Sequence, residues 1–205
     1  RGGSNLQMES PLQTCYELGM SNFRRKHLPG ETFFFTLVTY RRRPLFRSGL
    51  ARTCLREAME EQIRTHPFNL FAICLLPDHL HCVWILPRGD SDYSARWQVI
   101  KKCFTQRYLD GGGVDLPVTD GERRQNRKGI WQSRFWEHTV RDEQDLERCV
   151  DYLHWNPRKH GLVSRVRDYP FSSFHRFVEE GQYELDWGGT DPEFGRANKT
   201  NWGEP

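Results

Sequence analysis

The sequence predicts an α+β fold, and three observations lead to this prediction. Short runs of apolar, aromatic and β-branched residues are typical of strands, while other stretches carry apolar residues at helical spacing. The two kinds of segment follow one another in the order β-α-β-β-α-β-α. This order is typical of a ferredoxin-like sandwich, an antiparallel sheet with helices on one side, here with an added C-terminal helix and an extended tail.

The first half of the domain is predicted to contain three strands and one helix. The first strand is dense in aromatic and β-branched residues, and the helix has apolar residues at helical spacing with charged residues between them. In chain order, we expect a strand at residues 32–40, a helix at 48–65, a strand at 68–76 and, after a turn at 77–78, a third strand that completes a hairpin with the second.

The second half is predicted to contain two helices and one strand. Three consecutive glycines and a stretch of basic residues without a core-forming pattern separate the first of these helices from the strand. We expect that stretch, residues 110–129, to be a mobile basic loop without regular structure. The expected elements are a helix at 94–109, a strand within 131–141 centred on 136–140, and a helix at 142–156 that Pro157 ends.

Charge is distributed unevenly along the 205 residues. Residues 22–47 contain seven basic residues and only one acid, Glu31, whereas residues 179–205 contain seven acids and only two basic residues. A polyanion-binding surface and a tail that covers or moderates it would explain this distribution, and so would an ordinary solvated surface. We predict a leader or expression remnant at 1–19, a catalytic domain with a basic N-terminal arm at 20–178, and an acidic tail at 179–205.

The six cysteines include no C-x-x-C pair and no regular disulfide framework. Most of them lie in apolar patterns, so we expect buried thiols rather than a zinc ribbon or a secreted disulfide scaffold. No apolar run approaches the length of about 20 residues that a membrane-spanning helix needs. We therefore expect a cytoplasmic protein without a membrane partner.

Two histidines stand one residue apart at the start of the third strand. Successive side chains of a strand point to opposite faces, so His79 and His81 point the same way and could share one metal ion. A pair of ordinary, locally hydrogen-bonded histidines is the alternative. The turn before the pair and the apolar residues after it put the histidines at the mouth of a buried strand.

The last predicted helix carries a second candidate pair. Leu146, Val150 and Leu153 form an apolar stripe that predicts its buried face, and Tyr152 and Asn156 lie four residues apart on the flank of that stripe. We expect the tyrosine hydroxyl and the amide oxygen to point outward together. A packed tyrosine and an asparagine that ends the helix would be the structural alternative.

Together these residues would suit phosphodiester chemistry. Two histidines and an asparagine would give three ligands to one divalent ion, which can polarise a phosphate and stabilise the charge that develops on it. A tyrosine beside the ion is a suitable nucleophile, because a phosphotyrosine link keeps the bond energy for resealing. Arg158 and Lys159 could neutralise flanking phosphates.

Both stretches resemble the motifs of one known superfamily. The sequence Leu-Pro-Asp-His-Leu-His at 76–81 resembles the His-hydrophobe-His motif of the HUH endonucleases, and residues 151–157 resemble their single-tyrosine helix. Over about residues 20–183 the chain most closely resembles the REP-associated tyrosine transposases. Further matching stretches are residues 131–138, 156–161 and 169–174.

The resemblance implies an enzyme that cleaves and rejoins single-stranded DNA at hairpins of repetitive extragenic palindromes (REP). It implies a covalent 5′-phosphotyrosine intermediate on Tyr152 and a Mg²⁺ or Mn²⁺ ion bound by His79, His81 and Asn156. Ligand softness alone would also allow the two imidazoles to prefer zinc. A monomer and a homodimer, with the tyrosine acting in cis or in trans, are both compatible with the sequence.

The charge pattern and the aromatic residues indicate how such DNA could be held. Phosphates of a hairpin stem would contact basic side chains, and unpaired bases would stack on aromatic rings such as Trp131, Phe135, Trp155 and Trp187. The expected DNA-binding residues are Arg24, Arg25, Lys26, Arg41, Arg42, Arg43, Arg158 and Lys159.

Two other functions are compatible with these patterns. A non-catalytic regulator could bind DNA hairpins on the same fold, and a metal-dependent hydrolase could use water as its nucleophile. The presence of His79, His81, Tyr152 and Asn156 in one chain favours the enzyme, because a regulator would need none of them. Replacement of the tyrosine distinguishes a covalent mechanism from hydrolysis.

Overall fold

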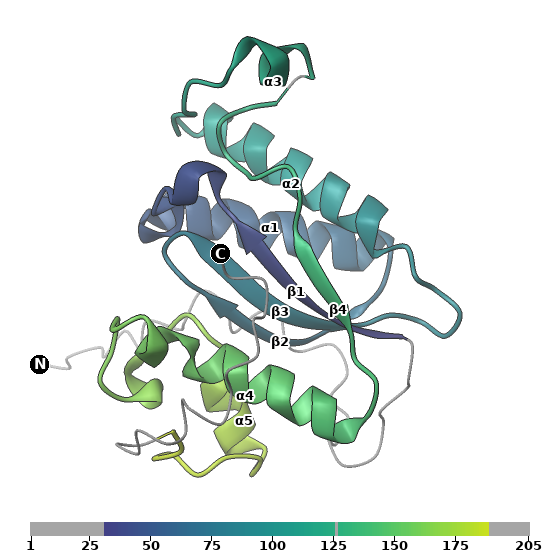
Figure 1. Ribbon diagram of the computed structural model, residues 1–205, viewed down its shortest axis with the longest axis vertical. Helices are drawn as coiled ribbons and strands as arrows, with labels where there is room; N and C mark the ends of the chain where they lie inside the picture. Colours follow the sequence, from purple (N-terminus) through teal and green to yellow (C-terminus); the bar gives the residue numbers. More distant parts are fainter. Residues whose placement is uncertain (1–30, 126, 189–205) are drawn as a thin grey trace, which may run out of the picture.

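A four-stranded antiparallel sheet, with strands in the order β2-β3-β1-β4, forms the middle layer of the protein (Figure 1). The computed structural model describes residues 31–125 and 127–188. The elements are β1 (Thr32–Val38), η3 (Tyr40–Arg42), η4 (Leu45–Arg47), α1 (Gly49–Thr65), β2 (Asn69–Leu75), β3 (His79–Ile85), α2 (Tyr93–Asp110), α3 (Asp120–Arg124), β4 (Trp136–Thr139), α4 (Glu143–Lys159), η5 (Val166–Asp168) and α5 (Phe174–Glu179).

Helices cover both faces of this sheet. Helices α1 and α2 pack side by side on one face, while α4 and α5 lie on the other (Figure 1). The core follows the same division. One buried cluster joins Phe35 and Trp84 of the sheet to α1 and α2, and a second joins Phe34 and Val83 to α4. The strand order and the antiparallel pairings confirm the predicted ferredoxin-like α+β fold.

The alternation of side chains along β3 determines which residues enter which core. Leu80, Cys82 and Trp84 belong to the cluster beneath α1 and α2. Because successive strand residues point to opposite faces, His79 and His81 are on the face that α4 covers. Strand β1 pairs with β3 in a matching register that sets Thr36 opposite His81.

Helix α4 extends further than the sequence predicted. Asp142 caps its N-terminus by accepting a hydrogen bond from the Asp145 amide at 2.8 Å, in agreement with the predicted start. The prediction that Pro157 ends the helix was wrong, because the helix continues to Lys159. Proline removes one amide donor, but the next turn still closes through the His160 amide, which donates to the Asn156 carbonyl at 3.0 Å.

The basic stretch at 110–129 contains regular structure that the prediction omitted. Helix α3 begins with a capping box, in which the Thr119 hydroxyl accepts from the Glu122 amide and the Glu122 carboxylate accepts from the Thr119 amide. The T-x-x-E pattern that encodes this box is visible in the sequence. An isolated bridge between Leu116 and Gly129 then closes the base of the stretch.

Some predictions concern residues outside the described ranges. These are the leader at 1–19, the arm residues Arg24, Arg25 and Lys26, and most of the acidic tail at 179–205. Within the described residues, no helix combines the length and the apolar character needed to cross a membrane.

A network around Asp145 stabilises the start of α4 and yields a stability prediction. Its Oδ2 accepts hydrogen bonds from the Arg141 amide at 3.1 Å and from His138 Nε2 at 2.8 Å. Burial alone would raise the pKa of this carboxyl group, but the hydrogen bonds from Arg141 and His138 outweigh it and lower the pKa to about 2. The ionised form is therefore the one that stabilises the fold.

We expect Asp145→Asn to lower the free energy of unfolding at pH 7 by about 1–3 kcal/mol, because the charged acceptor is lost. The contribution of Asp145 is fully present above the unfolded pKa of ~3.9 and is lost as the pH falls through about 2. Urea titrations between pH 7 and pH 2 should thus show the two proteins converging. Asp115→Asn, at an exposed position, is the control, and a difference that persists unchanged at pH 2 would contradict the assignment.

Candidate active site

The two histidines of β3 lie under α4 and are almost completely buried. His79 is 1% exposed and His81 is 0% exposed, and their ring centroids are 5.0 Å apart. The pair therefore faces one way, as the strand pattern predicted. Burial of two imidazoles side by side requires polar partners for their ring nitrogens.

Asp78 holds the first histidine. His79 Nδ1 lies 2.6 Å from Asp78 Oδ1, and the guanidinium of Arg42 donates to Asp78 Oδ2 at 2.9 Å. Burial alone would raise the pKa of Asp78, but His79 and Arg42 outweigh it and lower the pKa to about 2. An ionised carboxylate only accepts hydrogen bonds, so His79 Nδ1 carries the proton and Nε2 is the basic nitrogen.

Thr36 of β1 provides the corresponding partner of the second histidine. Its hydroxyl oxygen lies 2.9 Å from His81 Nδ1, inside the sheet face. Phe34, two residues earlier on the same strand, packs its ring at 5.5 Å from the His81 ring. Both histidines thus have a polar partner at Nδ1, a contact of the kind that orients metal-binding imidazoles.

Tyr152 packs directly against His81, the second histidine of the pair. Its ring centroid is 5.3 Å from that of His81 in an edge-on arrangement, and the residue is 2% exposed. The hydroxyl accepts a hydrogen bond from Lys159 Nζ at 3.0 Å. This contact places a cation beside the phenol oxygen.

Asn156 lies on α4 between Tyr152 and His160, the two residues whose rings contact the histidine pair. Tyr152, Asn156 and His160 are spaced four residues apart and share one side of the helix. Tyr152 contacts His81, while the His160 ring is 5.2 Å from the His79 ring, so Asn156 lies over the pair. The expected outward orientation was wrong, because Asn156 is 0% exposed and Tyr152 is buried on the sheet side. The flank of α4 that carries Tyr152 and Asn156 is therefore buried together with the apolar stripe.

The donor set fits a divalent metal ion. Two imidazoles whose Nδ1 atoms already have partners and one carboxamide oxygen are ligand types that first-row divalent metals accept. The Asp78–His79 contact is of the carboxylate–histidine kind that orients metal-binding imidazoles in other proteins. The geometry thus brings together all four residues that the sequence singled out for chemistry.

A second group with metal-ligand chemistry lies at the start of α4. Potential ligand atoms of His138, Asp145 and Cys149 lie within 4.8 Å of one another. The Asp145 carboxylate already accepts hydrogen bonds from Arg141 and His138, and burial raises the pKa of the Cys149 thiol far above neutrality. Ion pairs and hydrogen bonds are sufficient to explain why these residues lie together, without a metal ion.

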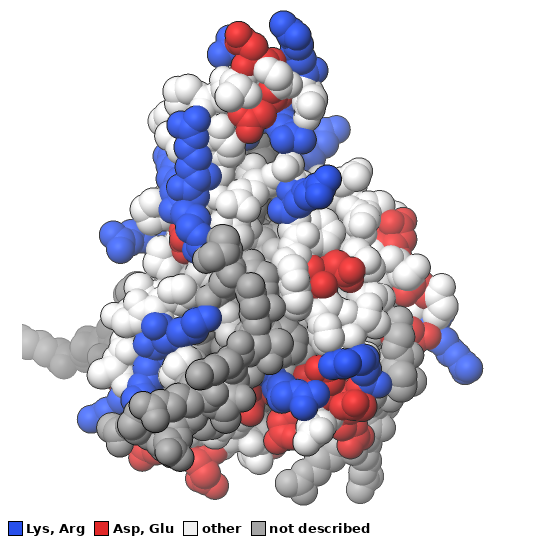
Figure 2. All heavy atoms as spheres, in the orientation of Figure 1, with Lys and Arg blue, Asp and Glu red and all other residues white. Residues whose placement is uncertain are grey.

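The predicted DNA-binding residues have more varied surroundings. Arg41 is exposed beside the Tyr40 ring, whereas Arg42 binds Asp78 and Lys159 binds Tyr152. Arg43 and Arg158 donate to the backbone carbonyls of Val114 and Gly188. Figure 2 shows Lys and Arg side chains around the upper end of the visible face, over α3 and the end of α2.

Comparison with known proteins identifies the family. The chain is 42% identical over 183 residues to a REP-associated tyrosine transposase of Escherichia coli (strain K12), covering 88% of this chain and 98% of that protein. The chain belongs to the REP-associated tyrosine transposase family. A Haemophilus influenzae protein of the same family name is 40% identical over 175 residues, covering 83% of this chain and 94% of that protein. No family model matches the sequence.

A solved structure agrees with this membership. It shows a REP-associated tyrosine transposase bound to a REP hairpin, with 40% sequence identity and a TM-score of 0.66. The match covers 91% of this chain and 98% of the other. Family membership and fold, both expected from the motifs, are confirmed.

The sequence patterns did not predict the contacts that three residues make at this site. Thr36 and Asp78 hold the histidines, and His160 packs against His79. Asp78 is directly before the histidine pair, so its role could have been inferred from the frequency of carboxylate–histidine contacts at metal sites. Thr36 becomes visible only when the pairing register of β1 and β3 is known.

The Asp78 contact makes a prediction about the His79 tautomer. We expect Asp78→Ala to increase the population of the Nε2–H form, because the acceptor for Nδ1–H is removed. Long-range proton–nitrogen correlation spectra distinguish the two forms. His154, whose Nε2 lies 2.8 Å from the Ser173 hydroxyl, is an internal control that should not change. An unchanged His79 pattern in the variant would contradict the assigned contact.

Proposed function

We propose that the protein is a metal-dependent endonuclease and transposase that cleaves and rejoins single-stranded DNA at REP-type hairpins. Tyr152 is the proposed nucleophile, and His79, His81 and Asn156 are the proposed metal ligands. The observation that carries this proposal is the packing of Tyr152 against the buried histidine pair. The REP hairpin bound by the 40% identical relative supports the choice of substrate.

In the proposed reaction the Tyr152 oxygen attacks a backbone phosphorus in line with the leaving 3′-oxygen. A bond forms between the tyrosine oxygen and phosphorus, and the bond between phosphorus and the 3′-oxygen breaks. The phenol proton passes to solvent water before attack, and the 3′-oxygen takes up a proton from solvent to leave as a hydroxyl group. Attack by a 3′-hydroxyl on the phosphotyrosine reverses these steps and joins two strands.

This chain's residues would each have a distinct task. Lys159 would stabilise the phenolate through its contact with the Tyr152 hydroxyl. Asp78 and Thr36 would keep His79 and His81 in the orientation that offers Nε2. Bound Mg²⁺ or Mn²⁺ would polarise the scissile phosphate and stabilise the charge that develops on it. Because Tyr152 packs against a histidine of its own chain, the arrangement supports attack in cis.

Tyr152→Phe provides the most selective activity test. We expect it to abolish the covalent DNA adduct and to reduce cleavage of a labelled REP hairpin oligonucleotide by at least ~100-fold, because no nucleophile remains. Incubation with Mn²⁺ or Mg²⁺ followed by a denaturing gel measures both quantities. Tyr40→Phe, which removes a hydroxyl that donates to Glu122 at 3.0 Å, is the matched control.

The same assay separates the alternative functions. Cleavage that persists in Tyr152→Phe without an adduct would indicate a hydrolase that uses water. Hairpin binding without any cleavage by the unmutated protein, under both metal conditions, would indicate a non-catalytic regulator. Either result would contradict the proposed function.

Metal binding is testable without activity. We expect His81→Ala to remove most Mn²⁺ binding and Asp78→Ala to weaken it by about 10-fold to 100-fold, as other outer contacts of metal sites do. Isothermal titration of the DNA-free protein with MnCl₂ measures the affinity. Asp115→Ala, at an exposed loop position, should bind like the unmutated protein. Equal affinity in all four proteins would show that the ion binds elsewhere.

A further inference from the structure

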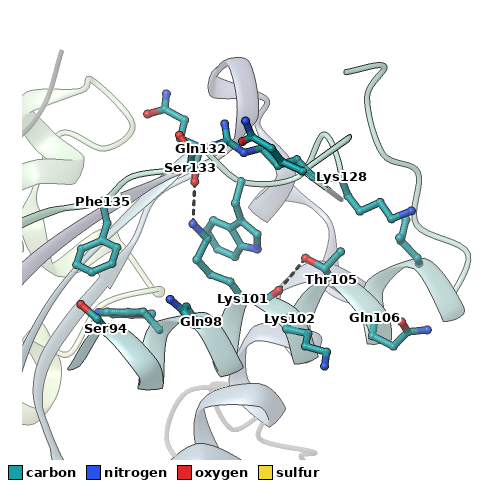
Figure 3. Close-up of a pocket in the computed structure, with 15 residues that line it drawn as sticks. Ser94, Gln98, Lys101, Lys102, Thr105, Gln106, Lys128, Gln132, Ser133 and Phe135 are labelled. Carbon is teal, nitrogen blue, oxygen red and sulfur yellow. Dashed lines mark hydrogen bonds between the residues drawn. The ribbon is translucent and has the colours of Figure 1, made fainter. Parts of the chain in front are cut away.

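A pocket of about 630 Å³ lies on the other side of the sheet from Tyr152. It opens between α2 and the segment that leads into β4, and Figure 3 shows side chains from both entering it. Four cationic residues line it, and among the described lining residues none is acidic. Its lining includes Gln98, Lys101, Lys102, Lys128, Trp131 and Phe135.

Lys101 is the central cation of this pocket. It reaches from α2 across the pocket and donates to the Gln132 carbonyl at 2.7 Å (Figure 3). Burial, followed by the charge of nearby Arg127, lowers the pKa of Lys101 to about 8. A partly buried ammonium among other cations is unfavourable by itself, and an anion bound beside it would relieve that cost.

Aromatic and amide side chains complete the lining. Trp131 lies with its ring centroid 5.9 Å from Lys101 Nζ, and Phe135 packs at 6.3 Å from the Trp97 ring at the other end. Four glutamines, which can both donate to and accept from a base edge, surround these rings: Gln98, Gln106, Gln125 and Gln132. Rings, amides and cations are what a base and its phosphate require together.

The edge strand β4 connects this pocket to the catalytic face. Phe135 is in contact with the core beneath α2, whereas the next residue, Trp136, packs at 6.0 Å from Phe34 on the face that holds Tyr152. Two successive aromatic residues thus point to opposite faces of the same edge. A DNA strand that passes around this edge would therefore lie close to an aromatic ring on each face of the sheet, Phe135 on one and Trp136 on the other.

We propose that this pocket binds one unpaired nucleotide of the single-stranded DNA, with the base against Trp131 and Phe135 and its phosphate beside Lys101 and Lys102. This inference rests on the proposed DNA substrate and adds a second contact point away from the cleavage site. Two of the four aromatic residues singled out in the sequence, Trp131 and Phe135, line this pocket.

Fluorescence anisotropy of the full chain with labelled single-stranded hexanucleotides, one for each base, tests the proposal. We expect Lys101→Met and Gln98→Glu each to weaken binding of at least one hexanucleotide by roughly fivefold or more, since one removes a phosphate contact and the other adds a repelling charge. The matched controls, Arg64→Met and Gln144→Glu at exposed positions outside the pocket, should change affinity by less than about twofold. Thermal melting verifies that each variant is folded.

Two further probes make the result specific. An abasic hexamer of the same charge should bind more weakly than the best hexanucleotide, and equal binding would overturn the proposed base contact. Unchanged affinity in both folded pocket variants would overturn the site as a whole. Hexanucleotide binding by an unmutated chain that does not cleave the REP hairpin would count against the proposed function and not against this pocket.

Discussion

The alternation of side chains along β3 is the constraint on which the candidate site depends. Leu80, Cys82 and Trp84 are buried beneath α1 and α2, and this requirement fixes which way the remaining residues of the strand point. A slip of one residue would turn His79 and His81 into the apolar core. The same register places Thr36 of β1 opposite His81, so the hydrophobic core and the polar site are specified by one pairing.

Two successive polar contacts connect the turn after β1 to β3. Arg42 adopts a left-handed conformation, with φ of 51°, and its guanidinium binds Asp78, which in turn holds His79. Left-handed arginines are uncommon and persist where surrounding contacts determine them. Arg42, expected from the sequence to contact DNA, thus has a structural partner at the site. Lys159 likewise joins the site through the Tyr152 hydroxyl.

Much of the fold was predictable because its elements have clear periodicity. Runs of apolar, aromatic and β-branched residues predicted all four strands, and the stripe of Leu146, Val150 and Leu153 identified the buried face of α4. The end of α4 was not predictable from Pro157 alone, since later hydrogen bonds closed the next turn. The burial of Tyr152 and the roles of Thr36 depend on contacts between distant segments, which local patterns do not contain. The site residues themselves came from motifs, and their chemical roles are still proposals.

The position of a bound divalent ion tests the proposed metal site most directly. Anomalous diffraction from crystals of the protein grown with Mn²⁺ locates the ion without reference to activity. We expect one strong peak within coordination distance of His79, His81 and Asn156, next to the Tyr152 hydroxyl. A peak at His138, Asp145 and Cys149 instead, or none near the histidine pair at saturating Mn²⁺, would contradict it.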